Sequence, residues 1–139
     1  MAGTIRVRAD ILKEMLGHAR REPGIECCGL LAGRDGIVTV IFPAKNALAS
    51  ATAYEIAPQE LFGFFRQMRA EGLEHLGIYH SHPSSENAPS ARDVQQAYYS
   101  DQAYFIVSPL ADAPKPVRAF SIRDGEVREL EIVETTADV

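Results

Sequence analysis

The stretch GIYHSHPSSENAPSARD, residues 77–93, places two histidines at the end of a short apolar run, with one residue between them. Residues at positions i and i+2 of a strand point to the same face, so His80 and His82 can reach one point in space. A proline ends the strand, and a polar loop then leads to Ser90 and Asp93. The stretch therefore predicts a strand, a loop and a helix start that bring two imidazoles and a carboxylate together.

Two imidazoles and one carboxylate are a ligand set typical of catalytic zinc sites, which keep a fourth position for water. Ser90 is expected to start a helix, with Asp93 in its first turn as the acid of a capping box. Each residue also has an ordinary explanation, because histidines at strand ends are often surface residues and Ser90 and Asp93 suit a helix N-terminus. The combined spacing favours a metal site, and both explanations can hold at once.

A base is needed beside such a metal, and Glu26 is the candidate. It lies in the mostly apolar run IECCGLLAG, residues 25–33, where a buried acid is costly without a partner. The alternative is that Glu26 is exposed at the beginning of the strand or pairs with an arginine. Glu86 is nearer in sequence but lies in a polar loop, and we interpret it as a solvated residue.

Composition limits the class of protein. The 139 residues, of which 46% are hydrophobic, predict one domain over residues 1–139. The net charge of −5 argues against a nucleic-acid partner. We find no segment of about 20 apolar residues and no signal peptide, so we expect a cytoplasmic protein without a membrane partner. Cys27 and Cys28 are adjacent, which excludes a disulfide framework; we interpret them as small buried residues rather than as a nucleophile or metal ligand.

The rest of the chain predicts a mixed α/β domain. Apolar spacing predicts helices over 9–21 and 57–72, a third helix begins at Ser90, and the small, polar residues 43–53 are expected to form a loop. Strands are predicted at 4–7, 25–33, 37–42, 54–56, 73–82, 104–108, 117–122 and 126–133. The helical residues predicted to lie in the core are Met15, Phe62, Phe65 and Met68.

The combination of Glu26 with His80, His82, Ser90 and Asp93 resembles the motif of the JAMM (MPN+) metalloproteases. The segment from Glu26 to Gly33 is similar to the corresponding strand of the small prokaryotic members, and the resemblance covers nearly the whole chain. It implies an α/β fold: a single MPN/JAMM (cytidine-deaminase-like) domain with a mixed, mostly antiparallel curved sheet flanked by helices.

The resemblance also implies a zinc-dependent metallopeptidase. Such an enzyme hydrolyses the peptide or isopeptide bond after the C-terminal Gly-Gly tail of a ubiquitin-like or sulfur-carrier protein. His80, His82 and Asp93 would bind one zinc ion per chain. Glu26 would take a proton from the zinc-bound water and give one to the leaving amine, and Ser90 would hydrogen-bond the oxyanion or the water.

Short loops at 43–53 and 83–89 favour a simple substrate, a sulfur-carrier protein joined to an amino acid or a lysine. We expect the extended tail to add as a strand along residues 50–56. Small side chains nearby would leave room for it, namely Ala47, Ala49, Ser50 and Ala51.

Other functions are also considered. A non-catalytic MPN-type scaffold that binds ubiquitin-like tails or partner subunits would be expected to lack one of the five motif residues. A DNA-repair relative would be expected to have a basic face, and a zinc deaminase would need a Pro-Cys-x-x-Cys pair. The sequence is also compatible with a homodimer formed through an exposed strand edge or helix.

Overall fold

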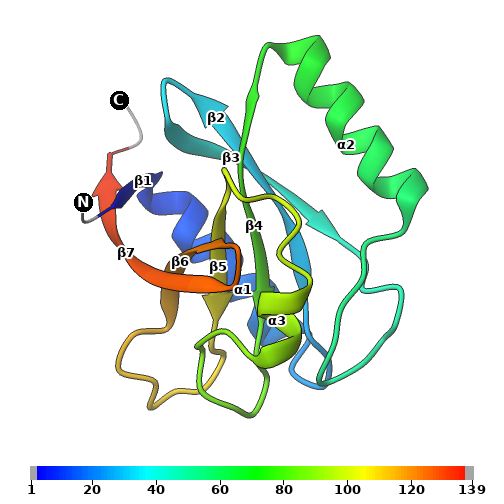
Figure 1. Cartoon of the computed structure of the whole chain (residues 1–139), viewed down its shortest axis with the longest axis vertical. Coiled ribbons are helices and arrows are strands. Elements are labelled where there is room, and N and C mark those ends of the chain that lie inside the picture. The colour runs from blue at the N-terminus through cyan, green and yellow to red at the C-terminus, as the bar shows by residue number, and fades with distance from the viewer. Residues whose placement is uncertain (1–2, 137–139) are drawn as a thin grey trace.

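Seven strands and three helices make up the part of the chain that the structure describes, residues 3–136 (Figure 1). In this computed structural model the elements are β1 (Thr4–Arg8), α1 (Ala9–Arg21), β2 (Cys28–Arg34), β3 (Ile37–Ala44), α2 (Pro58–Glu71), β4 (Glu74–Ser81), α3 (Ala91–Gln95), β5 (Ala103–Val107), β6 (Val117–Arg123) and β7 (Glu126–Thr135). Most of them begin and end within a few residues of the predicted ranges, because apolar periodicity and turn residues are local signals.

The strands form one mixed sheet that closes into a barrel in the order β1-β3-β2-β4-β5-β6-β7. The pairs β1–β3, β1–β7 and β4–β5 are parallel, and the other four pairs are antiparallel. The prediction of a mixed, mostly antiparallel curved sheet flanked by helices is therefore confirmed. Closure itself was not predicted, because it depends on β1 pairing with both β3 and β7, which are distant in sequence.

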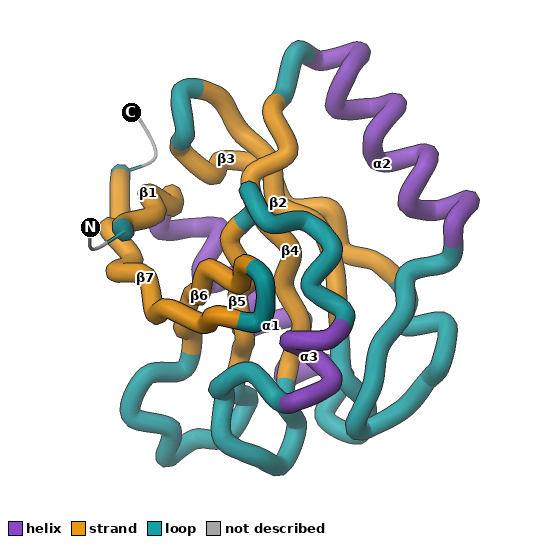
Figure 2. Tube along the Cα trace, in the orientation of Figure 1, coloured by secondary structure: helices purple, strands orange, loops and turns teal. Residues whose placement is uncertain are grey.

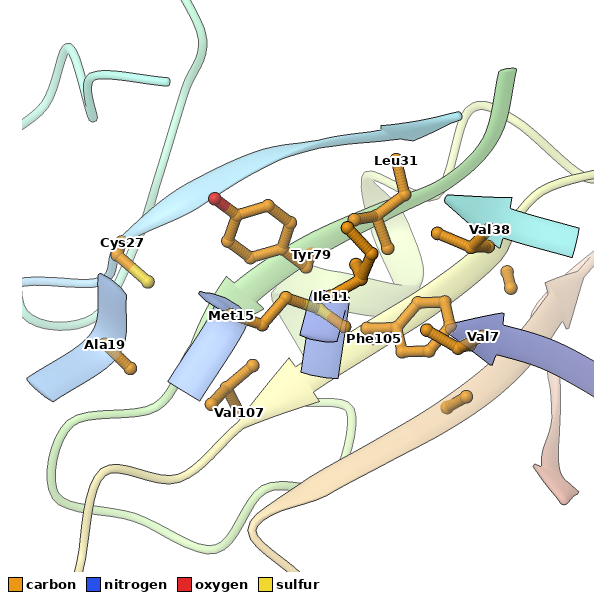
Figure 3. Packing of buried hydrophobic residues seen from close by; sticks show 12 residues of the cluster. Val7, Ile11, Met15, Ala19, Cys27, Leu31, Val38, Tyr79, Phe105 and Val107 are labelled. Carbon is orange, nitrogen blue, oxygen red and sulfur yellow. The ribbon is translucent and has the colours of Figure 1, made fainter. Parts of the chain in front are cut away.

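Both faces of the central strands are buried. Helix α1 covers one face, where its residues Ile11 and Met15 pack against Tyr79 of β4 and Phe105 of β5 (Figure 3). The other face packs against α2, whose Met68 belongs to the same cluster as Ile78, Ile106 and Leu30. Among residues 3–136, no helix has the length and apolar character needed to cross a bilayer.

Two predicted strands are shorter than expected. The run 25–33 becomes a strand only at Cys28, because the Glu26 N–H donates to Ser50 O (2.8 Å) in a neighbouring loop. The predicted strand 54–56 is reduced to a single antiparallel bridge between Ile56 and Asn46. Residues 45–57 therefore form an irregular segment that lies against the beginning of β2.

One predicted core residue is wrong. Met15 and Met68 are buried and Phe65 is half-buried, but the Phe62 side chain is 66% exposed. The face of α2 that contacts the sheet contains Phe64 in place of Phe62. Phe62 instead lies under the Arg66 guanidinium, 5.4 Å from the ring centroid.

Candidate metal centre

The C-terminal end of β4 carries the two histidines. His80 pairs with Cys28 of β2 on one side and with Ile106 of β5 on the other, so its backbone is held between two strands. His82 lies just past the strand and donates its N–H to Val107 O at 3.0 Å. The backbone is therefore still extended there, and the two imidazoles meet on one face, as the i, i+2 spacing predicts.

Ser81, between the histidines, points to the opposite face and aligns the segment that precedes β2. Its N–H donates to Cys27 O (3.0 Å), and its Oγ accepts from the Cys27 N–H (2.8 Å). These bonds continue the register in which Cys28 faces His80. Continued by two residues, the same antiparallel register would bring Glu26 level with His82, and the charge of His82 acts on the Glu26 carboxyl.

The loop after β4 leads into α3, which lies beside the end of β4 (Figure 2) and carries Asp93 in its first turn. The buried Asn87 anchors this loop by donating to Lys115 O at 2.8 Å and Ile106 O at 3.3 Å. Ser90 then caps α3: its Oγ accepts from the Asp93 N–H (3.1 Å), while Asp93 Oδ2 accepts from the Ser90 N–H (2.9 Å). The predicted capping box is present, and it also orients the Asp93 carboxylate.

The donor atoms of His80, His82 and Asp93 converge. The two Nε2 atoms lie 3.2 Å apart, Asp93 Oδ1 is 3.2 Å from His80 Nε2, and Asp93 Oδ2 is 3.1 Å from His82 Nε2. Tetrahedral ligands at about 2.0–2.1 Å from a zinc ion lie about 3.3 Å from one another. The three side chains can therefore hold one metal ion and leave a fourth position open.

The hydrogen bonds at this site fix which ring nitrogen of His82 is left for a metal ion. His82 Nδ1 lies 2.8 Å from Glu86 O, which can only accept, so Nδ1 carries a proton and Nε2 is the nitrogen that faces Asp93 and His80. Burial opposes ionisation of Asp93, but hydrogen bonds from His80 and His82 outweigh it and hold the pKa of this carboxyl well below its usual range. Burial lowers the pKa of His80, which favours a neutral imidazole.

Glu26 is buried next to these donors. Only 4% of the residue is exposed, and its Oε1 has no hydrogen-bond partner among residues 3–136. Burial raises its pKa from 4.5 to about 7; the charge of His82 lowers this pKa by a smaller amount, and the charge of Asp93 raises it. The alternative of an exposed or arginine-paired Glu26 is not what the structure shows, while Glu86 is solvated as expected, with its side chain 82% exposed.

Sequence reasoning missed three contributors to the site. The backbone carbonyl of Glu86 orients His82, the Tyr54 ring stacks on His80, and Asn46 donates to the Glu26 carbonyl. A carbonyl has no sequence signal, and the other two residues lie in a loop more than twenty residues from the histidines. Cys27 and Cys28 are fully buried, and burial raises the pKa of their thiols to about 11 and about 12, so neither is a ready nucleophile.

The family described as prokaryotic homologs of the JAB domain matches residues 8–123. The chain belongs to this family. The resemblance to the small prokaryotic JAMM/MPN proteins is thereby confirmed, and the matched range of this JAB-domain protein contains all five motif residues.

Curated relatives of this JAB-domain protein are named as proteases of carrier-protein conjugates. This chain is 36% identical to the CysO-cysteine peptidase of Mycobacterium tuberculosis over 125 residues, which cover 88% of this chain and 86% of the relative. It is also 36% identical to a desampylase of Haloferax volcanii over 112 residues, 76% of this chain and 81% of the relative. A probable TtuB-protein conjugate cleaving protease of Thermus thermophilus is 36% identical over 121 residues, 86% of this chain and 77% of the relative.

Solved structures agree with the JAB-domain fold. The solution structure of a protein from Desulfitobacterium hafniense superposes with a TM-score of 0.85 at 36% identity, covering 96% of this chain and 94% of that one. A JAB1/MPN domain protein from Archaeoglobus fulgidus has the same fold, with a TM-score of 0.61 at 22% identity, covering 96% of this chain and all of that one.

Proposed function

We propose that this JAB-domain protein is a zinc-dependent metallopeptidase that hydrolyses the peptide or isopeptide bond after the Gly-Gly tail of a ubiquitin-like or sulfur-carrier protein. The observation that carries the proposal is the convergence of two imidazoles and a carboxylate beside the buried carboxyl of Glu26. The names of the curated relatives support hydrolysis of peptide or isopeptide bonds in carrier-protein conjugates.

His80, His82 and Asp93 would hold the metal ion, one per chain. Two nitrogens and one carboxylate oxygen at this spacing suit Zn²⁺, and the donor set leaves a position for substrate or water. When bound, zinc would polarise the scissile carbonyl and lower the pKa of water to about 7. The remaining chemistry falls to residues of the chain.

Glu26 is the proposed general base and acid. In its carboxylate form it accepts a proton from the attacking water, and in its acid form it returns a proton to the leaving amine. Its pKa of about 7 suits both directions of transfer near neutral pH. Its Oε1 makes no hydrogen bond within residues 3–136, so this oxygen does not have to break an existing bond first.

Ser90 is the proposed donor to the oxyanion. Its Oγ already accepts the Asp93 N–H, but the hydroxyl proton is not used in that bond and can be donated. The residue is exposed, so a substrate can reach it, and the capping box fixes its distance from Asp93. One positioned donor of this kind contributes about 10²–10³ in rate.

The substrate tail is proposed to lie along residues 50–56, as predicted from the sequence. Glu55 uses its own N–H and C=O inside the loop, with Asn46 Oδ1 and the Ala47 N–H. In an extended chain the neighbouring residues point their backbone groups the opposite way, which supports addition of a strand there. The remaining expectations stay predictions: one domain over 1–139, a cytoplasmic location, no nucleic-acid or membrane partner, and a homodimer.

The test is cleavage of defined carriers. Ubiquitin-like proteins extended past Gly-Gly by one amino acid, or by a lysine-linked peptide, are incubated with zinc-loaded enzyme and followed by intact mass. We expect cleavage after Gly-Gly that stops with a zinc chelator and in Glu26→Ala. The relative rates on the two kinds of carrier show which bond is preferred.

The control variant is Glu86→Ala, which removes an exposed acid from the adjacent loop and leaves its backbone carbonyl in place. It should cleave like the wild type. Binding of carrier tails by zinc-loaded protein without any cleavage would contradict the proposal and favour the non-catalytic scaffold.

A further inference from the structure

The two histidines of the metal centre differ in what holds them. His82 is oriented through its second ring nitrogen, which donates to Glu86 O at 2.8 Å. Such a bond from the non-ligating nitrogen is the usual means of fixing a metal-binding imidazole. His80 lacks it: its Nδ1 is buried without a hydrogen-bond partner among residues 3–136.

The ring of Tyr54 contacts His80 where no hydrogen bond orients the imidazole. The Tyr54 and His80 rings are stacked, with centroids 4.6 Å apart and an interplanar angle of 22°. Rings in contact at this distance and angle restrict each other's rotation, because turning either one forces a steric overlap or loses the contact. Only 2% of His80 is exposed, so it has no solvent-filled space in which to turn.

We propose that Tyr54 is a positioning residue that fixes the orientation of the His80 imidazole for metal binding. The inference rests on the proposed function in one respect, since it takes His80 as a metal ligand. It goes further by assigning a role to the segment 45–57, which supplies none of the motif residues.

Asn46 explains how an irregular loop can hold a ring in place. This side chain is 2% exposed and spans the loop: Nδ2 donates to Ala53 O (2.9 Å), and Oδ1 accepts from the Glu55 N–H (3.3 Å). The residues on both sides of Tyr54 are thus bound to one amide. Nδ2 also donates to Glu26 O at 2.9 Å, so the same amide connects the Tyr54 loop to the proposed base.

Tyr54 also lines a cavity of about 230 Å³. Leu30, Ile56 and Ile78 are among its other walls. The Tyr54 ring therefore contacts a proposed metal ligand and also lines this cavity. The stacking contact with His80 is made by the ring, so phenylalanine would retain it.

The test measures zinc affinity directly, by competition with a chromophoric chelator, in full-length Tyr54→Leu and Tyr54→Phe. Loss of a residue that supports a metal ligand typically weakens binding by about 10–100-fold. We expect Tyr54→Leu to raise the zinc dissociation constant by about tenfold, and Tyr54→Phe to restore the wild-type value because the ring is retained. The visible spectrum of the cobalt-substituted protein should differ from that of the wild type in Tyr54→Leu and match it in Tyr54→Phe.

The matched control is Tyr98→Leu, which removes another tyrosine of the same cavity that is 77% exposed. It should bind zinc like the wild type. If Tyr54→Leu does not fold, as judged by circular dichroism, Tyr54→Met replaces it, since methionine fills irregular space without a ring.

Equal zinc affinity and an unchanged cobalt spectrum in a folded Tyr54→Leu would overturn the inference. Failure of Tyr54→Phe to restore affinity would also overturn it. Neither outcome depends on cleavage, so the inference and the proposed peptidase activity can fail separately.

Discussion

In the proposed reaction Glu26 would transfer protons and Ser90 would donate a hydrogen bond to the oxyanion. The immediate surroundings of each residue suit that role. Burial keeps part of the Glu26 population protonated near neutral pH, so one carboxyl can accept and return a proton. The capping bond uses only a lone pair of Ser90, which leaves its hydroxyl proton for an oxyanion. At the residue scale, the structure therefore makes separable predictions about catalysis and about stability.

Glu26→Gln should abolish cleavage without abolishing zinc binding. The amide nearly preserves the shape of the side chain but cannot accept the proton of the attacking water, so we expect kcat/KM to fall by about 10²–10⁴. Cleavage of a carrier conjugate and zinc affinity are measured on the same preparation. Loss of zinc binding in this variant would contradict the assignment of Glu26 as a base outside the ligand set.

Glu26→Gln should also stabilise the metal-free protein at high pH. The pKa of Glu26 is higher in the folded protein, about 7, than the ordinary value of 4.5, so its charged form opposes folding. The penalty is absent below pH 4.5, develops between pH 4.5 and 7, and is complete above pH 7. We expect a gain of about 1–2 kcal/mol at pH 8.

This second effect is measured by denaturant unfolding in the presence of a chelator, at pH 4 and pH 8. The wild type and the variant should be equally stable at pH 4. A gain of the same size at both pH values would show that ionisation of Glu26 is not its cause.

At the scale of elements, β2, β4 and α3 supply the site through their backbones. The pairing of Cys28 with His80 aligns the start of β2 with the end of β4, and the N-terminus of α3 presents Ser90 as its N-cap and Asp93 in its first turn. Changes in how these elements pack should therefore affect the candidate metal centre even where none of its proposed ligands is replaced.

Gly29→Ala should destabilise β2. A Cβ at this position would lie 2.5 Å from Phe42 O and 2.5 Å from Tyr79 Cε1, so one strand has to move. Overpacking of this kind costs about 1–3 kcal/mol, and the shift of β2 should also weaken zinc binding. Gly63→Ala on α2 is the control, because its Cβ would meet nothing within 4 Å and should leave both properties unharmed.

Ser90→Ala should weaken both the helix and the reaction. Loss of the cap costs about 1 kcal/mol, and loss of the oxyanion donor lowers kcat by about 10²–10³. Ser90→Thr keeps a hydroxyl that can cap and donate, and should retain most of the activity. Thermal unfolding and cleavage rates are compared, and an active Ser90→Ala would rule out the oxyanion role.

At the scale of the whole molecule, the candidate metal centre joins segments that are distant in sequence. Glu26, the loop 45–57, the end of β4 and the start of α3 meet only because the barrel is assembled. Little of such a site exists in the unfolded chain, so metal binding and folding should be thermodynamically linked.

Zinc should therefore raise the melting temperature of the protein. At a free concentration 100 times the dissociation constant, the stabilisation is about 2.7 kcal/mol. The effect should be lost with chelator and in Asp93→Ala, and retained in Asp101→Ala, where an exposed carboxylate is removed. Differential scanning calorimetry at several zinc concentrations measures it, and a melting temperature independent of zinc would contradict the site.

Local segments of this chain were predictable because their signals are local. The i, i+2 histidines, the following proline and the capping box around Ser90 each fit in one stretch, and all are found as expected. The prediction that Phe62 lies in the core was wrong because helical spacing alone allows several buried faces. Contact with the sheet selects the face of α2 that contains Phe64.

The sequence by itself determined which side chains make up this site and which elements carry them. Donor types, strand alternation and helix caps are properties of short segments. Only the tertiary structure decided the closure of the barrel, the burial of Glu26 and the stacking of Tyr54 on His80. These depend on contacts between segments far apart in the chain, where packing and the satisfaction of buried backbone groups outweigh local preference.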